Sequence, residues 1–204
     1  DTASPKVEGT ETFKVKLSAA TGGATISDNE AVGEITDNET ASLSIADVSV
    51  SEADGNAVFT VSSSYPLELS KTVTFSYTTE DGTAVAPGDY TVSSGTGSIT
   101  NGSSTTIVVP IIEDTASPKV EGTETFKVKL SAATGGASFS DDEAIGEITD
   151  NETASLSISD VSVSEAGGSA VFTVSSSYPL ELSKTVTLSY TTEVGTAVDP
   201  GDYT

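Results

Sequence analysis

The chain has 204 residues, with 31 Asp or Glu against 8 Lys or Arg, and a formal net charge of -23. This charge argues against nucleic acid and anionic membrane surfaces as partners, because both would repel the chain. His, Cys, Met and Trp are absent, which excludes imidazole catalysis, disulfides and thiolate zinc sites. No apolar run approaches the ~18 residues needed for membrane insertion of this segment.

The chain repeats itself. Residues 1–91 recur without a gap as residues 114–204, an offset of 114 − 1 = 113, and ten aligned pairs differ. Near-identical copies of this length indicate tandem whole domains. Each copy begins at ASLSI and ends at TDNE, which predicts the end of a preceding repeat (1–40), one complete repeat (41–152) and the start of a following repeat (153–204). We expect the array to continue beyond the printed residues.

The complete repeat is predicted to form short antiparallel strands, because its apolar residues alternate along segments that are bounded by turn signals. In chain order the predicted strands carry Leu43, Ile45, Val48 and Val50; Ala57, Phe59 and Val61; Val73, Phe75 and Tyr77; Ile107, Val109 and Ile111; Phe126, Val128 and Leu130; and Ile145 and Ile148. These rows are expected to form the core. About seven strands in a repeat of this size predict an all-β, two-sheet sandwich.

Three residues mark local features of these strands. Asp47 interrupts the alternation of the first strand, which predicts a bulge or kink. Asp54-Gly55 is a hairpin turn signal. Pro110 lacks an amide donor, so its strand is expected at a sheet edge or bulged. Lys127 and Lys129 are expected to face water.

The acidic residues collect where the predicted strands end. They are Glu52 after the first strand, Glu80 and Asp81 in TTEDGTA, Glu113 and Asp114 in PIIEDT, Glu121 and Glu124 in VEGTETF, and Asp150, Asn151 and Glu152 in EITDNE. Alternate strand ends of an antiparallel sandwich lie at one pole, so several of these segments should converge there. Calcium takes about 6–8 oxygen ligands, mostly carboxylates, and crowded carboxylates repel each other unless a cation neutralises them.

The same residues carry a family resemblance. EDGTAVAPGDY (80–90), PIIEDT followed by VEGTETFKVKLS, and GEITDNE stand in the order that resembles the Calx-β domain. The resemblance covers 41–152 and part of both flanks. It implies a Greek-key, immunoglobulin-like β-sandwich with calcium in the loops at one end, near the next domain. The metal ligands implied by position are Glu52, Asp81, Glu113, Asp114, Glu121, Glu124, Asp150, Asn151 and Glu152.

This sequence departs from the most acidic pattern of the family. Asn151 replaces a carboxylate, and Thr115 stands where a third acidic residue can occur. Both departures point to fewer ions or weaker binding. In the following repeat, Val194 replaces the aspartate of the DGTA turn, although Glu165 is kept. We therefore expect the two copies of the site to be unequal.

The predicted function is that of a calcium-binding structural module in a repetitive extracellular or cell-surface protein, such as an adhesin rod. Its cofactor is Ca²⁺ and its partners are the neighbouring repeats. Asp150 and Glu152 lie in the short connector TDNETAS, so a bound ion should stiffen the junction between domains. The alternative is an ion-free structural repeat or a filament subunit that pairs with other copies. An enzyme is not expected, because no imidazole or substrate cleft is indicated.

Overall fold

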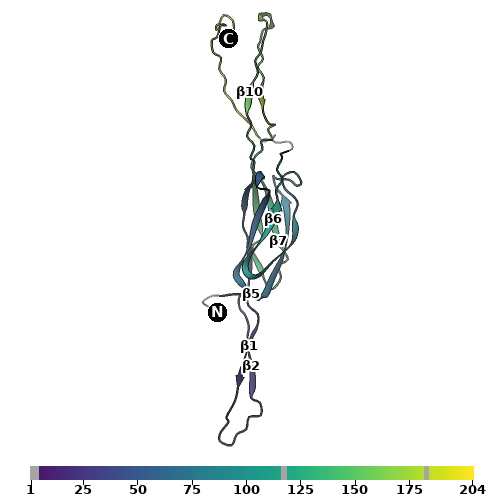
Figure 1. The fold of residues 1–204 in the computed structure, drawn as a ribbon, viewed down its shortest axis with the longest axis vertical. Coiled ribbons are helices and arrows are strands. Elements are labelled where there is room, and N and C mark those ends of the chain that lie inside the picture. Colours follow the sequence, from purple (N-terminus) through teal and green to yellow (C-terminus); the bar gives the residue numbers. More distant parts are fainter. Residues whose placement is uncertain (1–4, 116–118, 182–183) are drawn as a thin grey trace. The chain divides into compact units, whose positions relative to one another are not determined.

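The computed structural model describes residues 5–115, 119–181 and 184–204 (Figure 1). These residues divide into two compact units, the first holding 5–115 with 123–151 and the second holding 119–122 with 152–181 and 184–204. Residues 1–4 of the predicted preceding repeat lie outside the described part. Helical structure within the described ranges is limited to two three-residue 3₁₀ turns, and no helix there has the length and apolarity to cross a membrane.

The described residues of the complete repeat form seven strands, which agrees with the predicted number of about seven, although the individual strands differ from the predicted rows. They are β3 (Ser42–Ile45), β4 (Val48–Ser51), β5 (Asn56–Asp81), β6 (Ser94–Pro110), β7 (Glu124–Ser131), β8 (Ser138–Asp141) and β9 (Glu143–Thr149). The rows at 57–61 and 73–77, predicted as separate strands, are two halves of the continuous strand β5. The two rows resemble separate strands because inward residues alternate with a period of two in each half of β5.

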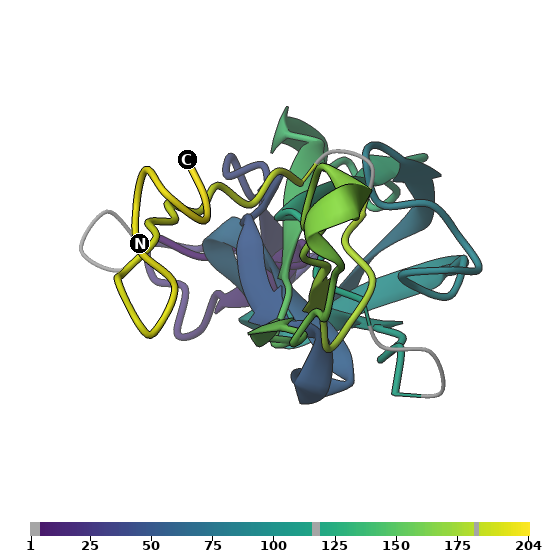
Figure 2. The ribbon, with the colours of Figure 1, turned by 90° about the horizontal axis from the view of Figure 1, so that it is seen from above.

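The two layers of the sandwich share strands β5 and β6. These strands pair antiparallel at residues 56–62, 67 and 72–78 of β5, with register shifts between Ser62 and Leu67 and between Leu67 and Thr72. Before the shifts β5 pairs with β3, and after them it pairs with β7. One layer therefore contains β8 and β3, and the other contains β7, β9 and β4. Figure 2 views the strands from one end.

Aromatic rings join the two layers in the core. Phe59 of the first layer meets Phe126 of the second edge to face, with ring centroids 5.8 Å apart. Tyr90 stacks on the same Phe126 ring at 4.5 Å. Most residues of the predicted core rows are buried, and Val48, Val50 and Tyr77 are partly buried and pack against the core. Ile145 is an exception at 44 % exposed, because β9 turns Ala144 and Ile148 inward instead.

The break at Asp47 is a change of sheet rather than a bulge within one strand. β3 pairs with β5 and β8, whereas β4 pairs in parallel with β9. The Oδ1 atom of Asp47 accepts a hydrogen bond from the Ile145 backbone N–H at 2.7 Å. The carboxylate thus supplies an acceptor to β9 at the point where the chain crosses from one layer to the other.

Asp54-Gly55 forms a turn, but the hairpin prediction is wrong. Glu52–Asp54 is a 3₁₀ turn closed by Gly55 at φ 71, a left-handed conformation that glycine adopts at little cost. The strands on either side do not pair across this turn, because β4 joins β9 and β5 joins β3. The turn instead carries the chain from one layer to the other.

The edge prediction for Pro110 is confirmed. Strand β6 pairs with β5 in the described sheet and ends at Pro110, so the missing N–H costs no ladder bond. Lys127 and Lys129 lie on the outer face of β7 as predicted, in ion pairs with Glu143 and Glu80 at 2.6 and 2.7 Å.

The flanking repeats keep fewer strands. In the first unit, β1 (Glu11–Lys16) and β2 (Glu30–Ile35) form an antiparallel pair. Phe13 there is 53 % exposed, although its counterpart at 13 + 113 = 126 is fully buried. The second unit contains the antiparallel pair β10 (Leu156–Ile158) and β11 (Val174–Ser176), and a 3₁₀ turn at Glu165–Gly167.

Candidate metal centre

Three chain segments of the first unit end at one place in the complete repeat. Parallel pairing of β4 with β9 puts Ser51 opposite Thr149, so the residues after both strands emerge at the same end. Antiparallel pairing of β6 with β5 puts Pro110 opposite Asn56, beside the 3₁₀ turn. The backbone N–H of Ile111 then donates to the Gly55 carbonyl at 3.0 Å. The predicted convergence of these strand ends is therefore built into the pairing.

The carboxylates of Glu52, Glu113 and Asp114 gather at this end, and they are called the acidic group below. Each offers an oxygen, and these oxygens lie within 4.8 Å of one another. Glu52 is 4 % exposed, and the other two are half-buried. Burial strengthens the repulsion among like charges, because less water screens them.

Asn151 links the acidic group to the connector that leaves β9. Its side-chain Nδ2 donates a hydrogen bond to Oε1 of Glu113 at 3.3 Å. The amide of asparagine carries a carbonyl oxygen on its other side. If the terminal torsion of Asn151 rotated, its side chain would offer the carbonyl oxygen to a cation instead of donating an N–H to Glu113.

The donor set and spacing of the acidic group fit calcium. Calcium holds carboxylate oxygens at about 2.3–2.6 Å, so two ligands on opposite sides of one ion lie up to about 5 Å apart. The oxygens of the acidic group lie within 4.8 Å of one another. Magnesium requires about 2.0–2.1 Å and a tighter octahedron, while zinc usually takes imidazole or thiolate ligands, which this chain lacks.

Asp81 occupies a different structural role from the acidic group. Its Oδ1 accepts a hydrogen bond from the buried Tyr90 hydroxyl at 2.6 Å and another from the Ala86 N–H at 3.1 Å. These two donors lower the pKa of Asp81, with the Tyr90 hydroxyl contributing most. Burial, followed by the hydrogen bond to Asp81, raises the pKa of Tyr90 to about 12. Asp81 therefore closes the turn that follows β5, and its role as a metal ligand stays a prediction.

Asp89 is a carboxylate that the sequence analysis did not select. A side-chain oxygen of Asp89 lies within 4.8 Å of one from Glu124, the first residue of β7. Oδ2 of Asp89 accepts a hydrogen bond from the Val85 N–H at 2.6 Å. The PGDY turn signals only this loop closure, since a carboxylate four residues after Val85 can accept the turn bond, and it does not signal the approach of Glu124.

The remaining predicted ligands fall into two sets. Asp150 directly follows β9 in the first unit and is half-buried. Glu121 and Glu152 belong to the second unit, where Glu121 pairs with Lys119 at 2.9 Å. The ligand roles of these three residues stay predictions.

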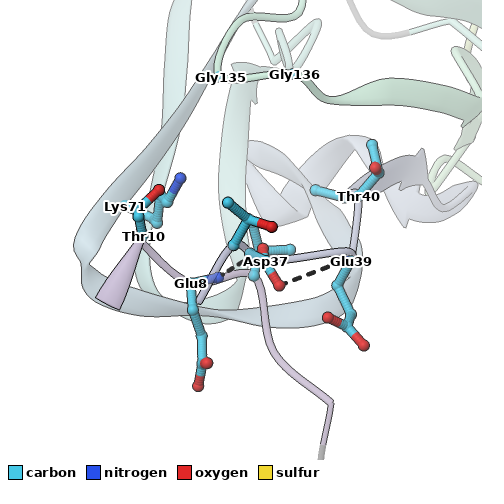
Figure 3. A pocket seen from close by; sticks show the side chains of 11 residues that line it. Glu8, Thr10, Asp37, Glu39, Thr40, Lys71, Gly135 and Gly136 are labelled. Carbon is cyan, nitrogen blue, oxygen red and sulfur yellow. Dashed lines mark hydrogen bonds between the residues drawn. The ribbon is translucent and has the colours of Figure 1, made fainter. Parts of the chain in front are cut away.

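The preceding repeat carries an equivalent acidic connector, which lines a cavity of about 230 Å³ in the first unit (Figure 3). Asp37, whose counterpart is at 37 + 113 = 150, lies between Glu8 and Glu39. Its two carboxylate oxygens accept hydrogen bonds from the backbone N–H groups of Glu8 at 2.9 Å and Glu39 at 3.2 Å. Although burial opposes ionisation, these bonds and the Lys71 ammonium hold the pKa of Asp37 below its usual value.

The chain is similar to a known protein family. A family model described as the Calx-beta domain matches residues 34–152 and 147–204. No curated protein matches the chain. Among solved structures, the apo form of the Calx CBD1 domain is similar at 22 % identity and TM-score 0.48, covering 56 % of this chain and 100 % of that one. The calcium binding domain CBD12 of CALX1.1 is similar at 23 % identity and TM-score 0.46, covering 52 % and 44 %.

Proposed function

Because the chain belongs to the Calx-beta domain family, we propose that its complete repeat binds calcium through the acidic group. The observation that carries the proposal is the approach of Glu52, Glu113 and Asp114 within 4.8 Å of one another. Three carboxylates at this separation, one of them buried, form a site that a divalent cation would stabilise. Calcium is favoured over other metals because every offered ligand is an oxygen.

The connector to the following repeat would share this ion. Asn151 already contacts Glu113, and Asp150 and Glu152 are its chain neighbours. If these residues supply further oxygens, one ion ties the body of the sandwich to the connector. Without the ion, repulsion among the carboxylates favours a junction that hinges.

The wider role follows from the tandem arrangement. We propose that the chain is a segment of an extracellular or cell-surface rod, such as an adhesin, in which each repeat is a spacer rather than an enzyme. Calcium is abundant outside cells, and extracellular modules bind it with dissociation constants of about 10⁻⁴–10⁻³ M. The neighbouring repeats are then the main partners, and assembly into filaments with other copies is the alternative.

Calorimetric titration of the full chain with calcium, followed by the same titration with magnesium, tests the proposal. Calcium is expected to bind and to raise the melting temperature, with little response to magnesium. Glu113→Gln with Asp114→Asn should remove the response. Glu80→Gln is the matched control, because Glu80 pairs with Lys129 on the outer face and lies outside the acidic group. A wild-type chain that neither binds calcium nor melts at higher temperature with it would leave the ion-free spacer as the function.

A further inference from the structure

We propose that a loop of each repeat docks on the preceding repeat and holds it with or without calcium. The docking loop is residues 64–68, with the sequence SYPLE, between the two halves of β5. Its partner is the docked segment, residues 6–8 of the preceding repeat, with the sequence KVE. Both belong to the first unit.

Two backbone hydrogen bonds join the docking loop to the docked segment. The Val7 N–H donates to the Pro66 carbonyl at 3.0 Å, and the Glu68 N–H donates to the Val7 carbonyl at 3.1 Å. Val7 and Leu67 form a parallel bridge. Both polar groups of Val7 are thus satisfied by the loop, which is the requirement for burying a backbone segment.

An apolar contact accompanies the backbone bonds. Val7 is 5 % exposed and Leu67 is 3 % exposed, and both belong to the hydrophobic core of the first unit. Leu69, only two residues further along, is 76 % exposed. Leu67 therefore contacts the preceding repeat, whereas Leu69, just after the loop, lies in solvent, because the two-residue alternation of an extended strand, which would place both on one face, is not kept here.

The same contact recurs 113 residues later, within the second unit. The Val120 N–H donates to the Pro179 carbonyl at 3.0 Å, and the Glu181 N–H donates to the Val120 carbonyl at 3.0 Å. Val120 and Leu180 again form a parallel bridge. None of the ten differences between the two copies of the sequence falls in the loop or in the docked segment.

Docking also orients the acidic connector. The residue after Val7 is Glu8, whose N–H donates to Asp37, and Asp37 in turn accepts from the Glu39 N–H (Figure 3). A continuous chain of hydrogen bonds therefore leads from the loop of one repeat to the connector carboxylate of the repeat before it. This contact involves no ion, so it supplies a restraint that chelation cannot remove.

Residue-resolved amide exchange on the full chain in excess chelator tests the docking. We expect the amides of Val7, Glu68, Val120 and Glu181 to exchange at least about tenfold more slowly than unstructured amides, since both bonds must open for exchange. Leu67→Asp should remove protection at Val7 and Glu68 while leaving the second pair protected. Leu69→Asp, the matched control on the exposed side, should leave all four protected.

A second pair of variants covers the case in which Leu67→Asp unfolds the repeat, which loss of core protection at Phe59 would reveal. Glu68→Pro deletes the N–H donor, and Glu68→Ala keeps it, so protection at Val7 should fall in the first variant alone. Unprotected Val7 and Glu68 amides in a folded wild-type chain would overturn the docking proposal, as would their full protection in folded Leu67→Asp or Glu68→Pro. Absence of calcium binding would overturn the proposed function and leave this result unchanged.

Discussion

Neutralising Glu52 should change the stability of the complete repeat in opposite directions with and without calcium. The proposed variant is Glu52→Gln, which keeps the size of the buried side chain and removes its charge. In chelator the variant is expected to be more stable than the wild type, because one of three clustered charges is gone. In calcium it should gain much less stability than the wild type, because a ligand charge is lost.

The magnitude follows from the spacing of the acidic group. At the 4.8 Å upper limit of the oxygen separations, two unit charges repel by about 0.9 kcal/mol at the dielectric constant of water and by about 3.5 kcal/mol at an effective value of 20. Glu52 faces two such partners, Glu113 and Asp114. Side-chain relaxation and salt reduce the repulsion, so we expect a gain of about 1–3 kcal/mol in chelator. A hundredfold excess of calcium over its dissociation constant stabilises the wild type by about 2.7 kcal/mol.

Urea unfolding of both proteins, in calcium and in chelator, measures the four free energies of unfolding. Glu80→Gln serves as the control, since it removes one carboxylate from an exposed ion pair with Lys129 and should alter neither the chelator stability nor the calcium response greatly. If Glu52→Gln is less stable than the wild type in chelator, repulsion within the acidic group is not the dominant effect. An undiminished calcium response would exclude Glu52 as a ligand.

Three further predictions concern the core, the DGTA turn and pH. Gly146→Ala should destabilise the repeat by about 1–3 kcal/mol, because the added Cβ atom would lie 2.5 Å from one phenylalanine ring and 2.9 Å from another. The control is Gly102→Ala, whose added Cβ atom would meet no other atom within 4 Å. Thermal melts should therefore show a loss of stability in the first variant and not in the control. Asp81→Val, which copies Val194, should lower the melting temperature in chelator as well as in calcium, since Tyr90 loses its acceptor; a loss confined to calcium would indicate a ligand instead. The pKa of Tyr90 is raised from 10.0 to about 12 in the folded chain, so its contribution to stability is complete below pH 10 and is lost as pH rises toward 12. In urea melts, Tyr90→Phe should reduce the loss of stability over this pH range. An unchanged dependence of stability on pH would contradict the raised pKa of Tyr90.

The strands and the core could be predicted because they depend on a local pattern. Alternation places Phe59 and Phe126 inward whatever the neighbouring strand is, and both are fully buried. The pairing of strands was harder to foresee, since Asp54-Gly55 closes a hairpin and a crossover turn equally well. Only the partners of β4 and β5 distinguish the two.

The acidic group could be predicted in part for a similar reason. Glu52, Glu113 and Asp114 follow strand ends, and strand ends of a sandwich gather at its poles. Asp81 also follows a strand end, yet it bonds to Tyr90, nine residues away in sequence. Asp89 was missed because its neighbour Glu124 is brought to it by the pairing of β5 with β7, which no local motif encodes.

The last prediction concerns the junctions of the array, where two restraints act. The docking loop restrains the docked segment without an ion, and a calcium ion shared by the acidic group and the connector would restrain the chain after β9. We expect calcium to lengthen the chain in small-angle scattering and to raise its melting temperature, because the connector loses freedom when its carboxylates are neutralised. In chelator, Leu67→Asp should shift the scattering further toward a flexible chain than Leu69→Asp does, since the ion-free restraint is then also lost. If neither the maximum dimension nor the melting temperature responds to calcium, packing between adjacent domains sets the junction and the stiffening proposal fails.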